Sequence, residues 1–193
     1  AGMDALAYYY HGEGGNLYER MIAGIIVGNC LLTKAGVPCA GEGDLKTAVA
    51  MKIFDLLGAG GSFTEIVAAD YDRDTILLGH DGPFHMAMTD DRPVLRGMRV
   101  FHGKSGQGVS VEAKIKPGPL TLFGVTQTAD GQVKFVVSEA EAVAGETLYI
   151  GNTQTHVKFP VHVDEFYDGW FGQSPTHHCA MGLGHNAALL RKL

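Results

Sequence analysis

The second half of the chain contains a succession of short segments in which every second residue is apolar. The clearest lies between Val109 and Ile115, and similar segments cover residues 120–127, 133–137 and 147–150. A period of two is typical of strands with one buried face, and the connections between these segments are too short for helices. The Asp130-Gly131 pair is a strong signal for a hairpin turn. We therefore expect residues 84–193 to form an antiparallel β-barrel with terminal helices and a His-His loop.

The first 83 residues have a different pattern. A short apolar run at residues 5–10 is followed by a helical periodicity from Leu17 to Lys34 and by a very short strand that ends at Cys39. A second helix is expected from Leu45 to Leu57, with Asp44 as its N-cap. This order of elements, strand, helix, strand and helix, is typical of the start of a parallel sheet. The predicted fold class is a partial parallel α/β (Rossmann-like) domain over residues 1–83, followed by the barrel.

Two further features of this first region are predicted. Residues 62–69 and 75–79 are strand-like and are joined by an acidic turn, so we place them in the α/β domain. The second helix is expected to bury its apolar residues, which are Leu45, Val49, Ile53, Leu56 and Leu57.

Composition excludes several classes of partner. The 193 residues have a formal net charge of −6 and no basic run, so nucleic acid is not expected to bind. The best apolar segment, Met21 to Leu32, is interrupted by glycine and asparagine and is shorter than the roughly 18 residues of a membrane span. The three cysteines are an odd number without paired spacing, which favours a reducing compartment. We expect a cytoplasmic protein.

Acidic and imidazole side chains stand beside glycines at the ends of apolar segments. Glu42 lies in a Gly-Glu-Gly-Asp sequence, Glu65 follows a Ser-Phe-Thr sequence, His80 follows a strand-like segment, and His178 ends a His-His pair. Two carboxylates with one or two histidines favour Mn²⁺ or a similar ion. Taken singly, a histidine or glutamate at a turn is most often a hydrogen-bonded or solvated structural group, so both interpretations stay open at this point.

A calcium loop is one motif that we reject. Asp70, Asp72 and Asp74 have the spacing of the first three EF-hand ligands, but Thr75 stands where the sharp turn needs glycine, and no helices flank the segment. We interpret these acids as a solvated hairpin turn.

Four motifs together resemble the C-terminal half of the L-arabinose and L-fucose isomerase superfamily. The resemblance runs in order from about Ala5 to His185. The motifs are residues 39–47, 61–65, 79–83 and 176–180. The resemblance implies a metal-dependent aldose-ketose isomerase that moves a proton between C1 and C2 of a sugar through an enediol. The ion that it implies is Mn²⁺, with Co²⁺ or Mg²⁺ as alternatives.

The resemblance also implies roles for individual residues. Glu42 and Glu65 match residues that bind the ion and exchange protons with the sugar, and His178 matches a further metal ligand. His80 matches the remaining ligand, although known arabinose isomerases have one more residue before this histidine. His85 is therefore an alternative ligand or a substrate contact, and His177 is a second candidate substrate contact.

Members of this superfamily have a large N-terminal region, and residues of that region in a neighbouring subunit complete the active site. The resemblance therefore implies a homo-oligomer, a missing N-terminal region as partner, and weak or no activity of these 193 residues alone. Two other functions stay open: a non-catalytic carbohydrate-binding module, and a structural or oligomerisation unit.

Overall fold

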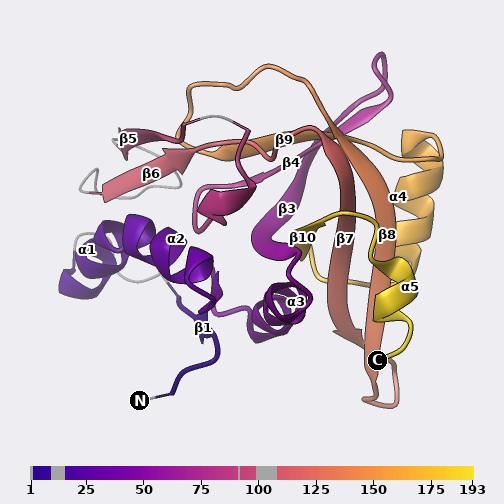
Figure 1. Cartoon of the computed structure of the whole chain (residues 1–193), viewed down its shortest axis with the longest axis horizontal. Helices are drawn as coiled ribbons and strands as arrows, with labels where there is room; N and C mark the ends of the chain where they lie inside the picture. The colour runs from indigo at the N-terminus through magenta and orange to yellow at the C-terminus, as the bar shows by residue number, and fades with distance from the viewer. Residues whose placement is uncertain (1, 10–15, 91, 99–107) are drawn as a thin grey trace.

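A closed antiparallel barrel of six strands is the centre of the computed structural model, which describes residues 2–9, 16–90, 92–98 and 108–193 (Figure 1). Around the barrel the strand order is β10, β3, β4, β9, β8, β7, and every neighbouring pair is antiparallel. The strands are β3 (Gly60–Asp70), β4 (Thr75–His80), β7 (Gly118–Gln127), β8 (Val133–Val143), β9 (Thr153–Lys158) and β10 (His178–Leu183). The prediction of an antiparallel barrel is thus confirmed, but the segment at 109–115, expected as one of its clearest strands, lies outside it in a separate two-stranded sheet.

Individual strand predictions had mixed outcomes. The β7–β8 hairpin turns at Asp130-Gly131 as expected, with Gly131 at φ +84°. The segment 147–150 is not a strand. The side chain of Gln154 accepts a hydrogen bond from the Leu148 N–H (2.9 Å) and donates one to the Leu148 carbonyl (2.8 Å). Side-chain bonds therefore satisfy this backbone in place of a neighbouring strand.

Two of the barrel strands come from before residue 84. We had placed β3 and β4 in the parallel domain, and this placement was wrong. The turn between them is only residues 71–74, which permits a hairpin, whereas a parallel pair needs a crossover of a dozen or more residues. The Asp70 carboxylate stabilises this turn by accepting from the backbone N–H groups of Asp72 (3.1 Å) and Arg73 (3.0 Å).

The parallel part of the described structure is small. Strands β1 (Leu6–Ala7) and β2 (Cys39–Ala40) pair in parallel, with helices α1 (Leu17–Gly24) and α2 (Ile26–Lys34) between them in sequence. The predicted helix over 17–34 is thus divided at Ile25. Tyr10, the last residue of the predicted first strand, lies outside the described residues. A pair of two-residue strands does not by itself make a Rossmann-like domain.

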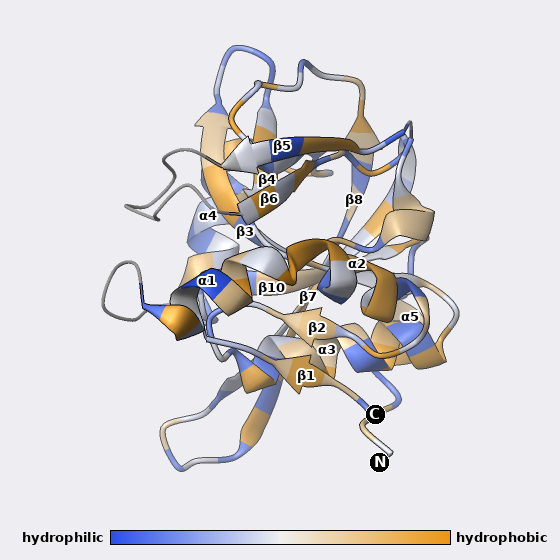
Figure 2. Cartoon of the chain, turned by 90° about the vertical axis from the view of Figure 1, so that its left-hand side faces the viewer, coloured by the Kyte–Doolittle hydropathy of each residue, from blue (hydrophilic) through white to orange (hydrophobic). Residues whose placement is uncertain are grey.

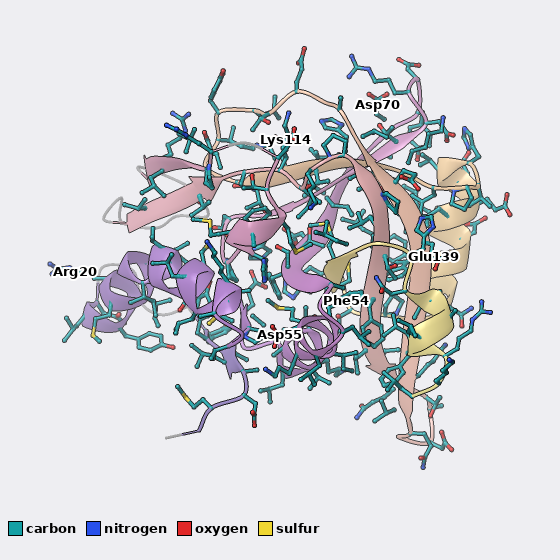
Figure 3. All side chains as sticks on the ribbon, in the orientation of Figure 1. Arg20, Phe54, Asp55, Asp70, Lys114 and Glu139 are labelled. Carbon is teal, nitrogen blue, oxygen red and sulfur yellow. The ribbon has the colours of Figure 1, made fainter. Side chains whose placement is uncertain are left out.

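Helix α3 (Leu45–Leu56) begins at the predicted N-cap, because Asp44 accepts from the Thr47 N–H at 2.9 Å. The prediction of its buried face was wrong. The helix buries Met51 and Phe54, and the Phe54 ring lies 5.7 Å from that of Phe123 in β7 (Figure 3). Leu45 and Leu56 are exposed instead. Helix α3 itself lies on the same side of the molecule as α2, β1 and β2 (Figure 2).

The remaining elements lie around the barrel. Helices α4 (Val163–Gly172) and α5 (Ala187–Leu190) lie beside β8, and a ribbon of β5 (Val94–Met98) and β6 (Gly108–Glu112) lies near α1 and α2 (Figure 1). A short 3-10 turn, η1, covers Met86–Met88. In the part of the chain that the structure describes, no helix is long and apolar enough to cross a membrane. All three cysteines are free thiols and are buried.

The pairing of β4 with β9 requires glycine at position 79. A Cβ at this position would lie 2.0 Å from the Thr153 carbonyl oxygen, so Gly79→Ala must displace the β9 backbone. We expect this variant to lose on the order of 3 kcal/mol of unfolding free energy, measured by urea denaturation. Gly24→Ala is the control, because nothing lies within 4 Å of its added Cβ. Equal stability of the two variants would contradict the described pairing.

Candidate metal centre

Glu42 lies in a tight turn between β2 and α3 and has a left-handed backbone conformation. Its φ is +57°, and that of the following Gly43 is +69°. The left-handed backbone conformation costs a non-glycine residue on the order of 1 kcal/mol or more of stability. Residues in such strained conformations are concentrated at functional sites. The Gly43 N–H donates to the Tyr8 carbonyl (2.7 Å) and the Asp44 N–H to the Gly41 carbonyl (3.0 Å), which fixes the turn. The turn places the Glu42 side chain beside the last residue of β4, His80, and the first residue of β10, His178.

The barrel register brings the other candidate residues to the same place. His178 at the start of β10 pairs directly with Glu65 of β3, and Glu65 pairs on its other side with Gly79 of β4. His80 follows Gly79 and ends β4. Three neighbouring strands therefore deliver one carboxylate and two imidazoles to one site.

The Glu42 carboxylate lies between two buried imidazoles. Its Oε1 is 3.8 Å from Nε2 of His80, and its Oε2 is 3.4 Å from Nε2 of His178. Ligand atoms that bind one ion at about 2.1 Å lie about 3 Å or more apart. These three residues, called the inner trio below, have ligand atoms that all lie within 4.8 Å of one another.

A second group of ligands overlaps the first. Glu65, His177 and His178 also have ligand atoms within 4.8 Å of one another, and they are called the outer trio below. Nε2 of His177 is 3.7 Å from the Glu65 carboxylate and 4.0 Å from that of Glu42. The His177 side chain is 63% exposed, so this group faces solvent.

Each of the two buried histidines has a carboxylate near its Nδ1 atom. Nδ1 of His178 makes a hydrogen bond to Asp44 Oδ2 (3.1 Å), whereas Nδ1 of His80 lies 3.3 Å from Asp81 Oδ1 without hydrogen-bond geometry. Histidines that bind metals usually donate the second ring N–H to such a group, which fixes the tautomer and the ring orientation. Sequence reasoning assigned Asp44 only an N-cap role and gave Asp81 none. Their positions next to Glu42 and His80 were the available signal.

The direction of the hydrogen bond between His178 and Asp44 follows from the state of Asp44. Burial raises the pKa of Asp44, but hydrogen bonds from His178 and Thr47 outweigh it, and the pKa lies below its ordinary value. An ionised Asp44 only accepts hydrogen bonds, so Nδ1 of His178 must be the donor. Nε2 of His178 is buried and has no hydrogen-bond partner among the described residues. This atom lies 3.4 Å from the Glu42 carboxylate, so with Nδ1 as the donor to Asp44 it is the ring nitrogen that could bind a cation together with Glu42.

An aromatic ring of the barrel strand β3 packs against both histidines. The Phe63 ring centroid is 4.7 Å from that of His80 and 4.7 Å from that of His178. Phe63 itself is fully buried. This packing holds both imidazoles in place and excludes water from one side of the site.

The outer trio has altered acid-base properties. Burial, together with the charges of Glu42 and Asp81, raises the pKa of Glu65 above its ordinary value although His178 lowers it. Burial and neighbouring His178 lower the pKa of His177. A carboxyl with a raised pKa suits proton transfer near neutral pH.

The alternative ligand His85 lies elsewhere. Its backbone N–H donates to Ser62 Oγ (3.2 Å), and burial lowers the pKa of its imidazole, with smaller effects from the charges of Asp55 and Lys34. Neither trio contains His85. Of the two histidines that the sequence left open, His80 is the one beside Glu42.

Comparison with known proteins gives no identification. No family model matches this sequence, and no curated protein matches it. The resemblance to sugar isomerases therefore stays a prediction.

We expect Asp44→Asn to weaken binding of Mn²⁺ by about 10- to 100-fold, because an asparagine amide no longer fixes the tautomer of His178. Asparagine caps helices as well as aspartate does, so α3 should persist. Calorimetric titration with Mn²⁺ measures the effect. Asp72→Asn, an exposed acid in the β3–β4 turn, is the charge-matched control. An unchanged affinity in Asp44→Asn would show that this carboxylate does not support the site.

The lowered pKa of Asp44 also predicts a pH dependence of stability. An acid with a depressed pKa in the folded state stabilises the fold above its ordinary pKa, and this contribution is lost as the pH falls through the folded-state value. We expect Asp44→Asn to lose about 1 kcal/mol at neutral pH and progressively less in acid. Urea unfolding at several pH values tests this. A difference from the wild type that stays constant into strong acid would be inconsistent with it.

Proposed function

We propose that this chain is part of a metal-dependent aldose-ketose isomerase similar to L-arabinose and L-fucose isomerases. In this proposal Glu42, Glu65, His80 and His178 bind a divalent ion. The observation that supports it best is the convergence of two buried imidazole Nε2 atoms on one carboxylate, each imidazole having a second carboxylate at Nδ1. An ordinary buried histidine needs one hydrogen-bond partner and not this whole arrangement.

The donor set favours Mn²⁺, with Co²⁺ and Mg²⁺ as alternatives. Cys179 is next to His178 in sequence, but successive side chains of a strand point to opposite faces. Its thiol belongs to the apolar core, where burial raises its pKa strongly. The thiol is therefore protonated and directed away from the carboxylates, which disfavours a zinc-thiolate site.

The proposed reaction moves a proton between C1 and C2 of the sugar. The bound ion would supply stabilisation of the negative charge that develops on the sugar oxygens. Glu65 is the main candidate for the proton transfer, because its pKa is raised and it lies at the exposed side of the site. Glu42 is the second candidate, and the exposed His177 would contact the substrate from the solvent side.

The exposed apolar surface supports the proposal that this chain is part of a larger protein. Leu45, Val49 and Leu56 of α3 and Leu31 and Leu32 of α2 are all exposed. Parallel sheets are normally covered on both faces, and contiguous apolar surface usually marks an interface. We infer that the parallel pair β1–β2 belongs to a Rossmann-like domain completed by an N-terminal region. The whole protein would be a cytoplasmic homo-oligomer that acts on a small sugar.

The test is carbon-bound hydrogen exchange catalysed by the complete protein that contains this chain. With Mn²⁺ in D₂O, L-arabinose and L-fucose should incorporate deuterium at C2 and yield ketose, detected by NMR. We expect Glu65→Gln to lower the rate by about 10²- to 10⁴-fold. Glu141→Gln, an exposed glutamate on β8, is the matched control.

Two outcomes would contradict the proposal. Full turnover by Glu65→Gln would remove its assigned role in proton transfer. Sugar binding by the wild type without exchange or turnover would identify a carbohydrate-binding module instead.

A further inference from the structure

We propose that a cavity at the start of β4 binds a small uncharged polyhydroxyl compound, such as a sugar or a sugar alcohol. Its volume is about 390 Å³. The residues that line it are Arg73, Thr75, Ala144, Gly145, Glu146 and His156. Thr75 begins β4 and His80 ends it, so roughly 16 Å of strand separate this cavity from the candidate metal centre. The inference does not depend on a bound ion or on isomerase activity.

The hydroxyl of Thr75 is the observation that points to a ligand. This residue is only 7% exposed, and its Oγ1 has no hydrogen-bond partner among the described residues. A buried hydroxyl without a partner lowers the stability of a protein, and an apolar group of the same shape avoids that cost. A polar ligand in the cavity would give this hydroxyl a partner.

The imidazole of His156 is fixed against the backbone of residues 144–146. Its Nε2 donates to the Glu146 carbonyl at 3.0 Å, because a carbonyl oxygen can only accept. Nδ1 of the neutral ring is therefore a hydrogen-bond acceptor. A Cβ at Gly145 would lie 2.0 Å from the ring, so this position must be glycine. Lys114 Nζ donates to the Gly145 carbonyl at 3.3 Å, and this side of the cavity is thus preformed.

The charged groups of the cavity lie at its exposed rim and have opposite signs. The Arg73 side chain is 66% exposed and lies 3.6 Å from the Asp70 carboxylate, and Glu146 is exposed as well. A phosphate or carboxylate ligand would meet Glu146, and an amine would meet Arg73. The more buried lining consists of the Thr75 hydroxyl and the His156 imidazole, and an unpaired charge buried beside them would be costly.

Hydroxyl groups match this arrangement, because each one can both donate and accept a hydrogen bond. One molecule with several hydroxyls can donate to Nδ1 of His156 and bond to the Thr75 hydroxyl, while its outer hydroxyls reach Arg73 and Glu146. An apolar compound would leave these groups unpaired. A volume of about 390 Å³ lies within the range of small-molecule sites.

Titration of the 193-residue chain with glucose and xylitol, followed by NMR in the presence of EDTA, tests the proposal. Both compounds should shift the amide signals of Thr75, Gly145 and His156 in a saturable manner. Glucosamine and glucuronate are charged counterparts of glucose with nearly the same size. We expect each to bind about fivefold more weakly than glucose, because each brings a charge close to a group of the same sign.

Thr75→Val separates binding from stability. It should weaken glucose binding about fivefold or more, because the contact with the hydroxyl is lost. The melting temperature of the free chain should stay the same or rise, since no hydrogen bond of the described structure is lost. Thr64→Val is the matched control, because the Thr64 hydroxyl is also buried without a partner among the described residues but does not line this cavity. This control should leave glucose binding unchanged.

Three results would overturn the inference. Absence of saturable shifts with both glucose and xylitol would show that the cavity holds only water. Tighter binding of glucosamine or glucuronate than of glucose would identify a charged ligand instead. An unchanged affinity of Thr75→Val for glucose would place the sugar outside this cavity. None of these results bears on the proposed isomerase, which is tested with Mn²⁺ and Glu65→Gln.

Discussion

The site depends on the position of one carboxylate between two imidazoles. Glu42 reaches His80 and His178 only because its backbone adopts a left-handed conformation in the turn between β2 and α3. The same turn ends at Asp44, which caps α3 and holds His178. One short segment therefore supplies a ligand, a helix cap and the group that fixes a second ligand.

The barrel supplies the rigid frame for this segment. Strands β10, β3 and β4 are neighbours, so His178, Glu65 and His80 lie at adjacent positions although they are far apart in sequence. Such residues on paired strands are held more precisely than residues on loops. The strained turn can persist because these strands and α3 fix both of its ends.

Periodicity and spacing predicted some of this structure and missed the rest for physical reasons. The alternating segments at 120–127 and 133–137 and the Asp130-Gly131 turn predicted the β7–β8 part of the barrel, because these are local signals, whereas the alternating segment at 109–115 became β6, outside the barrel. The membership of β3 and β4 was missed, since strand pairing depends on distant partners. The buried face of α3 was missed because Leu45, Val49 and Leu56 are exposed, whereas the helix buries Met51 and Phe54. The site residues were predicted from glycine-flanked motifs, whereas Asp81 has a role only through the position of His80.

The central claim is that Glu42, His80 and His178 form a metal centre. Crystals of this chain grown with Mn²⁺ and measured near the manganese absorption edge test it directly. We predict one strong anomalous peak within about 2.3 Å of the Glu42 carboxylate and of both Nε2 atoms. A peak only at surface carboxylates, with the Glu42, His80 and His178 side chains bonded to each other or to water, would contradict the account.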